Sequence, residues 1–427
     1  MKASHASEHL NSEPGKGDAM DMTVIGICTF AYLLDGIVFT IMGPVAPEVA
    51  QALSLSNAQL GPIFSANLIG QCLGLVLFPL IGHRAGHRPI VIGTLIGFGL
   101  FQAASGLAAN AGQLFWLRLV TGFFLGGSLP SCLAMTTAAA PFHRRGLAIT
   151  ILFTGYAIGS TAAGLVPALF ISLGGWRAAM MAVGLACLAF AVVVWATLRE
   201  PRGEQATSPE PPDSAMRGVV ALVRPPYLLG TIALWILFIS MLTLSYCLNS
   251  WLPIMLVQVG REPGLAAMSV SIFSFGGIVA ALMVGLLIDR FGAKPVLGSF
   301  LVLAAVLLLV IGQVLASAST SVLLGLLVVC GFFALGAYGG VNVVLAGFYP
   351  PPQRALGIGV AKSIGRVGTV LAPIMIGIAL SAGLAETRVM SLFALPAGIA
   401  AVALLLIATP KHDKSTGAAA MKAKEGS

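Results

Sequence analysis

Charged residues are scarce in this sequence. Asp, Glu, Lys and Arg make up 9% of its 427 residues, whereas hydrophobic residues make up 58%. A soluble domain carries roughly 25% charged residues, so this chain has too few polar side chains to cover a soluble surface. The composition therefore indicates a protein that faces lipid, where every backbone amide must be paired within the protein.

Short segments of alternating polarity, which a transmembrane barrel requires, are also missing. The apolar runs are instead long and continuous, and a helical span needs about 20 mostly apolar residues. We therefore predict an all-α membrane protein with twelve transmembrane helices. The expected spans are 22–46, 57–81, 89–109, 112–140, 146–173, 176–198, 226–256, 264–288, 295–316, 319–349, 356–382 and 387–408.

Clusters of catalytic or metal-binding side chains are absent from the expected spans. The six cysteines lie far apart in apolar runs without a CxxC pair, which argues against disulfides and metal. No Ser/His/Asp set or paired carboxylates appear, so we predict neither an enzyme nor a cofactor. The net charge of +8 comes from loop residues beside the spans, so we attribute it to membrane topology and not to nucleic-acid binding.

Positive loop residues set the expected orientation. With the N-terminus inside, most Lys and Arg are cytoplasmic, and the outer loops hold Arg177, Arg261 and Arg388. This asymmetry predicts a bacterial inner-membrane protein with both termini in the cytoplasm, and polar residues 1–21 carry no signal peptide. The expected parts are a cytoplasmic tail (1–21), a six-helix bundle (22–198), a flexible cytoplasmic linker (199–225), a second six-helix bundle (226–408) and a cytoplasmic tail (409–427).

The two halves repeat at nearly one sequence offset. The matched segments are 83–89 with 289–295, 122–124 with 331–333, and 141–145 with 350–354. Each match falls at the corresponding place relative to the spans of its half. Two parallel six-span repeats resemble the architecture of the major facilitator folds.

A loop motif strengthens this resemblance. Gly285, Asp289, Arg290, Gly292 and Lys294 resemble the GxxxDRxGRR motif of the major facilitator superfamily, in its second-half copy. The glycine is expected to let helices approach closely, and the acid to meet a helix N-terminus or an arginine. Such a contact would latch the cytoplasmic side and break as the halves rock. A plain charged loop is the alternative.

The first-half copy of this motif is degraded. Pro79 replaces the glycine and His83 replaces the acid, while Arg84 keeps the basic position. We therefore expect a weaker latch there, with Arg84 among the gating residues.

Asp35 is the only acidic residue deep in an expected span. A carboxylate in the membrane needs a proton, an arginine partner or a wet cavity. We interpret Asp35 as a proton carrier, and a helix–helix hydrogen bond is the alternative.

Three basic residues also lie within spans. Arg118 opens an RxxxGxxxG pattern, and it either attracts substrate or gates protons, or it extends to the outer interface. Lys362 and Arg366 are four residues apart on one helix face. Arg366 is the preferred ligand for a carboxylate because its guanidinium is forked, whereas Lys362 binds the anion or only extends to the cytoplasmic interface. One acid and three bases favour an anionic ligand.

Further polar and aromatic residues within spans are weaker candidates for substrate binding. An aromatic and amide set near the end of span seven suits a planar ligand, although an interfacial aromatic belt explains Trp251 equally well. Amides in other spans could instead join helices. These candidates are Tyr246, Asn249, Trp251, Tyr338, Asn342, Asn67 and Gln71.

Together these residues resemble the aromatic acid:H⁺ symporter family over residues 22–408. Members import benzoate-type, hydroxybenzoate, phenylpropionate or muconate anions with protons across bacterial inner membranes. The family's first-span motif is DGxD, and here Val38 stands in place of its second acid. The resemblance implies that Asp35 is the proton site and that Arg366 and Arg118 are polar site residues. It rests on Asp35-Gly36, the Arg118 pattern, the Asp289 loop, residues 249–253 and residues 365–368.

The expected function is import of a small aromatic carboxylate with protons, by one chain working as a monomer. Its partners are the anion, protons and the lipid bilayer. Import of another organic anion, such as a dicarboxylate, nicotinate or sugar acid, is one alternative. Proton-antiport export of drugs or metabolites is another, although the Gly-Pro motif typical of exporters late in span five is absent, with no proline between Gly155 and Pro167.

Overall fold

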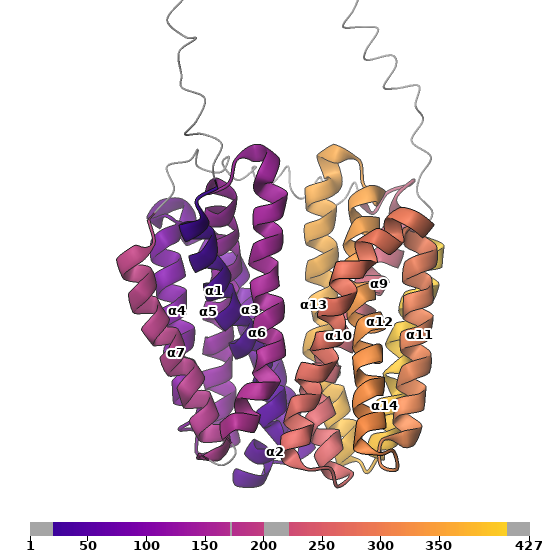
Figure 1. Cartoon of the computed structure of the whole chain (residues 1–427). Helices are drawn as coiled ribbons and strands as arrows, with labels where there is room; N and C mark the ends of the chain where they lie inside the picture. The colour runs from indigo at the N-terminus through magenta and orange to yellow at the C-terminus, as the bar shows by residue number, and fades with distance from the viewer. Residues whose placement is uncertain (1–19, 171–172, 200–221, 408–427) are drawn as a thin grey trace, which may run out of the picture.

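The computed structural model describes residues 20–170, 173–199 and 222–407, and it is helical throughout (Figure 1). Within these residues, twelve helical segments are long and apolar enough to cross a membrane. The predicted all-α class and the predicted number of spans are therefore confirmed. The expected linker and both expected tails fall mostly outside the described residues.

The first half contains α1 (Met22–Thr40), α2 (Met42–Ala52), α3 (Asn57–Ala85), α4 (His87–Ser105), α5 (Ala111–Ala138), α6 (Arg145–Phe170) and α7 (Gly175–Thr197), with a 3₁₀ turn at Phe142–Arg144. The second half contains α9 (Leu228–Gln258), α10 (Pro263–Phe291), α11 (Ala293–Val314), α12 (Thr320–Phe348), α13 (Pro351–Ser381), α14 (Glu386–Leu392) and α15 (Ala394–Leu406).

The first and last spans are each broken into two helices. The first span continues beyond the predicted residue 46, because α2 carries the chain on to Ala52 after a break at Ile41. Pro44 has no N–H to donate to the carbonyl of Thr40, which weakens the helix at this break. In the last span the break lies at Phe393, between α14 and α15. Side-chain caps begin α1, at Asp21, and α5, at Asn110.

The backbone repeats the internal symmetry that the sequence predicted. Gly86 and Gly292 occupy matching positions between α3 and α4 and between α10 and α11, with φ of 85° and 86°. Glycine takes up such positive φ without strain. Gly122 packs against the backbone of Asn67 on α3, and Gly331 packs in the same way against Phe273 on α10. The sequence repeat is therefore a repeat of turns and helix crossings.

Among the described residues, the two halves are in contact toward one end of the bundle. We call the end that carries residues 20, 199, 222 and 407 the terminal end, and the opposite end the far end (top and bottom of Figure 1). Across the halves α3 packs on α13, α6 on α10, and α2 on α9 and α10. The hydrogen bonds that join the halves run from the far end to the middle of the helices, and from there the ribbons diverge toward the terminal end (Figure 1).

Glycines and backbone carbonyls form much of this far-end contact. A Cβ added to Gly61 on α3 would lie 2.7 Å from the carbonyl oxygen of Pro373, and Gly377 on α13 packs equally closely on Asn57. The Ser65 hydroxyl donates to the carbonyl of Val370 at 2.6 Å. The halves are therefore in contact along α3 and α13 at the far end.

Candidate substrate site

Asp35 lies near the middle of α1 and is 1% exposed. Its Oδ2 atom has no hydrogen-bond partner. The groups that act electrostatically on its carboxylate are Ser128 on α5 and Arg366 on α13. The next residue, Gly36, lets α1 approach α6 so closely that an added Cβ would lie 2.6 Å from the Tyr156 carbonyl oxygen. This crossing fixes Asp35 at the inner surface of the first half.

Arg366 approaches from the second half. It is half-buried near the middle of α13, and its Nη1 donates to Oε1 of Gln71 on α3 at 2.8 Å. This is the hydrogen bond between the halves that lies nearest the terminal end. The structure thus brings the predicted residues Asp35, Arg366 and Gln71 to one level of the bundle, from both halves.

Aromatic side chains surround this pair of charges. The ring centroid of Tyr156 on α6 lies 5.0 Å from that of Tyr32 and 6.2 Å from that of Phe39. Phe39 in turn lies 5.6 Å from Tyr246 on α9. Tyr338 on α12 lies within electrostatic range of Arg366 and of Tyr156. Aromatic faces are suited to contact a planar ligand.

Three of these residues were not among the predicted site residues. Tyr156 lies in an apolar run without charge, whereas Tyr32 and Phe39 share α1 with Asp35. One available signal for Tyr156 was the spacing of Gly155 and Gly159, which pack against α1 and so bring α6 close to it. Helix-packing glycines therefore indicate which aromatic residues face the centre of the bundle.

Arg118 lies entirely within the first half. It is fully buried, and it donates to Gln102 Oε1 at 2.6 Å and to the backbone carbonyl of Val38 at 3.1 Å. Gln102 is held in turn by Met180. The predicted alternative of an arginine extending to the outer interface is therefore wrong. Arg118 ties α5 and α4 to the last turn of α1, three residues after Asp35.

Trp251 and Asn249 belong to the far-end contact. Trp251 is fully buried and meets the ring of Phe64 edge-on, with centroids 5.4 Å apart. The alternative of a lipid-facing aromatic belt is therefore wrong for Trp251. Asn249 donates to the carbonyl of Ser245 within its own helix, and its backbone packs against Gly43 of α2. Nearby, the hydroxyl of Tyr246 donates to the carbonyl of Phe64 at 2.9 Å.

The remaining polar candidates have separate environments. Asn342 bonds to the carbonyls of Tyr338 and Gly339 in its own helix. Asn67 is buried, and neither polar atom of its amide has a partner. Lys362 is exposed one turn from Arg366 toward the terminal end, and the two cations act on each other.

The predicted gating loop is open in this conformation. Asp289 is exposed and no ion pair is found for it among the described residues. Arg290 stacks on the ring of Phe291 at 5.2 Å, and Lys294 donates to the carbonyl of Ile407 at the end of α15. The expected close helix approach at Gly285 is wrong for this conformation, because nothing lies within 4 Å of an added Cβ. The side chain of Arg84 lies outside the described residues.

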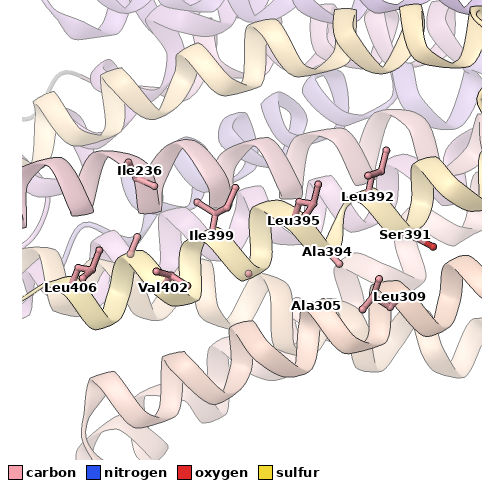
Figure 2. A pocket seen from close by; sticks show the side chains of 12 residues that line it. Ile236, Ala305, Leu309, Ser391, Leu392, Ala394, Leu395, Ile399, Val402 and Leu406 are labelled. Carbon is pink, nitrogen blue, oxygen red and sulfur yellow. The ribbon is translucent and has the colours of Figure 1, made fainter.

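A large apolar groove lies away from these charges. It has a volume of about 800 Å³ and lies between α9, α11, α14 and α15 (Figure 2). Its lining is aliphatic apart from Ser391, and Leu395 and Val402 in it are more than half exposed. A groove without charged groups does not suit an anion, so we place the candidate site at Asp35 and Arg366.

The arrangement has the parts of a carrier site for an anion. A guanidinium provides two parallel donors for a carboxylate, and a buried carboxylate with one oxygen unpartnered can exchange a proton. Because the two groups come from different halves, a relative movement of the halves changes both environments at once.

Comparison with known proteins decides the family. The sequence profile described as Major Facilitator Superfamily matches residues 28–271 and 246–425. The chain belongs to the major facilitator superfamily. Proteins of this superfamily are transporters and not enzymes, and with its twelve apolar spans the chain is a multi-pass inner-membrane transporter.

Similar transporters and structures agree with this assignment. The chain is 30% identical to the gallate transporter of Pseudomonas putida, over 91% of this chain and 92% of that one. It is 30% identical to the 4-hydroxybenzoate transporter PcaK of Pseudomonas aeruginosa (91% and 93%) and 31% identical to the 3-(3-hydroxy-phenyl)propionate transporter of Escherichia coli (92% and 96%).

Solved structures show the same fold. A bacterial homologue of the human lysosomal transporter Spinster, in its inward-facing and occupied conformation, matches with a TM-score of 0.74 at 20% identity, over 90% of this chain and 96% of that one. The D-xylose-proton symporter matches with a TM-score of 0.70 at 16% identity (92% and 99%). The predicted major facilitator fold is therefore confirmed.

Proposed function

We propose that this transporter imports a small aromatic carboxylate together with protons by alternating access. The observation that carries the proposal is that Asp35 and Arg366, from opposite halves, act on each other electrostatically and both act on Tyr156. The similar transporters named for gallate, 4-hydroxybenzoate and 3-(3-hydroxy-phenyl)propionate support the same ligand class, since each name describes an aromatic carboxylate.

In the proposed orientation both termini are cytoplasmic, so the end at which the halves diverge faces the cytoplasm. In the outward-open state Asp35 takes up a proton and Arg366 receives the carboxylate of the substrate. The halves then rock about this level. A substrate drives this change only by binding the two states with different affinities.

Release follows on the cytoplasmic side. Once the halves have parted at the terminal end, the anion exchanges with Gln71 on Arg366 and leaves past Lys362, and Asp35 loses its proton. Among the residues that the structure describes, Asp35 is the only acidic side chain at this level of the bundle, so we propose coupling through this one carboxylate. All of these groups belong to one chain, so a monomer contains the whole pathway.

Reconstituted transport tests this function. Purified protein in proteoliposomes with an alkaline interior should accumulate labelled 4-hydroxybenzoate, and a protonophore should abolish the accumulation. Unlabelled gallate and 3-(3-hydroxyphenyl)propionate should compete, whereas succinate should not. Accumulation that does not depend on the pH gradient would refute proton coupling. Competition by succinate as strong as that by the aromatic acids would refute the aromatic substrate class.

A further inference from the structure

Three tyrosine hydroxyls in the middle of the bundle have no hydrogen-bond partner among the described residues. They belong to Tyr32, Tyr156 and Tyr338, and their oxygens are not among the buried unpartnered atoms, so they keep some accessible surface. By contrast, the hydroxyls of Tyr246 and Tyr349 are bonded to Phe64 and Thr231. In the middle of the described bundle, the tyrosines with an unpartnered hydroxyl are thus these three.

These phenols come from both halves and act on one another electrostatically. Tyr32 and Tyr156 are in ring contact on the first half, and Tyr338 on α12 of the second half acts electrostatically on both. Arg366 acts on Tyr156 and on Tyr338. The two phenols on which Arg366 acts therefore come from opposite halves.

A phenol can donate and accept a hydrogen bond at the same time. If a carboxylate is held by Arg366, the ring of the ligand lies near Tyr156 and Tyr338, on both of which Arg366 acts electrostatically. A hydroxyl on that ring would pair with their phenols, whereas a bare ring would leave them without a ligand partner. Sites built to bond a hydroxyl discriminate strongly against analogues that lack it, because polar groups are left unpaired.

We infer that Tyr156 and Tyr338 determine specificity, by recognising a hydroxyl on the ring of the transported aromatic carboxylate. This inference rests on the proposed function and adds the residues that select among its substrates. Tyr156 presents its phenol from α6 and Tyr338 from α12, so hydroxyl recognition spans both halves of the site.

Competition experiments test the inference. Uptake of labelled 4-hydroxybenzoate is measured against unlabelled benzoate, 3-hydroxybenzoate and 4-hydroxybenzoate in wild type, Tyr156→Phe, Tyr338→Phe and the double variant. Wild type should prefer a hydroxybenzoate over benzoate by about tenfold, which corresponds to about 1.4 kcal/mol. Each single variant should reduce the preference to about threefold or less, through weaker hydroxybenzoate affinity and unchanged benzoate affinity. Tyr349→Phe, which loses a phenol bonded to Thr231, is the matched control and should keep the wild-type preference.

The possible outcomes distinguish a failure of hydroxyl recognition from a failure of the proposed transport function. If wild type shows no preference, or if the preference survives in the double variant, the phenols do not recognise a hydroxyl and the inference is overturned. If wild type transports no aromatic acid at all, the proposed function fails first. A structural role alone would lower transport of all three acids equally and leave their ratio unchanged.

Discussion

Arg366 donates from Nη1 to Oε1 of Gln71 over 2.8 Å, and this bond connects α13 of one half with α3 of the other. The same guanidinium is the proposed ligand for the substrate carboxylate. An arriving anion must therefore compete with an amide oxygen that already occupies one side of the fork. Because a carboxylate is the stronger acceptor, the exchange favours the anion.

Replacing this amide by an acid should block the exchange. The Glu side chain in Gln71→Glu has nearly the same shape as Gln, but it supplies a permanent carboxylate to Arg366. We expect the KM for aromatic acid uptake to rise at least about tenfold, the equivalent of about 1.4 kcal/mol. Initial uptake rates over a range of concentrations give the KM. The exposed Gln51→Glu is the control, and a wild-type KM in Gln71→Glu would show that Arg366 does not bind the anion.

Neutralising Asp35 should separate transport from proton coupling. Asp35→Asn keeps the size of the side chain but cannot exchange a proton. We expect uptake driven by a pH gradient to fall to background, while exchange of labelled for unlabelled substrate across the liposome membrane continues. Glu262→Gln, an exposed change at the start of α10, should retain both activities. Gradient-driven accumulation at the wild-type level in Asp35→Asn would remove Asp35 from the coupling mechanism.

The buried network of Arg118 should be a source of stability. Gln102→Leu leaves the guanidinium with only the carbonyl of Val38 as a partner. Removing one partner of a buried charge is strongly destabilising, so we expect a loss of about 3 kcal/mol, seen as a lower melting temperature in detergent. The double variant Gln102→Leu/Arg118→Met removes the charge together with its partner, and it should recover part of the loss. Additive losses in the double variant would contradict the pairing.

Glycine contacts at the far end should bias the conformational equilibrium. Gly61→Ala places a methyl group 2.7 Å from the carbonyl oxygen of Pro373, which forces α3 and α13 apart in the present conformation. We expect a shift toward the state that is open at the far end and closed at the terminal end.

Thiol labelling measures this shift. A cysteine introduced at the exposed Ser363 should react more slowly in Gly61→Ala than in the parent protein, with Cys72 replaced by Ser in both. Gly298→Ala is the matched control, because an added methyl group meets nothing within 4 Å there. An unchanged labelling rate in Gly61→Ala would mean that the far-end contact does not control access from the terminal end.

The sequence was sufficient to predict the spans and their repetition. Long apolar runs define helices in lipid, and the repeat survives in residues with a backbone role, such as Gly86 and Gly292 at matching turns. Charges inside spans were also informative, because their burial is costly unless they have partners. Asp35 and Arg366 were found in this way, and Gln71 was among the weaker polar candidates.

The partners of these residues depend on helix crossings and were less predictable. Nothing in the sequence around Arg118 indicates that its guanidinium bonds to Gln102 and to a backbone carbonyl of α1. From the sequence, Trp251 is equally well explained as an interfacial residue. The structure instead places it between the halves, in contact with Phe64. The close helix approach expected at Gly285 is also not seen, because a loop motif can make its contact in one conformation and lack it in another.

The hydrogen bonds that hold the two halves together join hydroxyls, amides and backbone carbonyls, and Arg366 is the only charged group in them. Neutral contacts are hardly affected by dissolved ions, whereas the attraction of an anion to Lys362 and Arg366 is screened over about 8 Å at physiological ionic strength. Concentrated salt should therefore slow the capture of substrate and leave the turnover of the empty carrier almost unaltered.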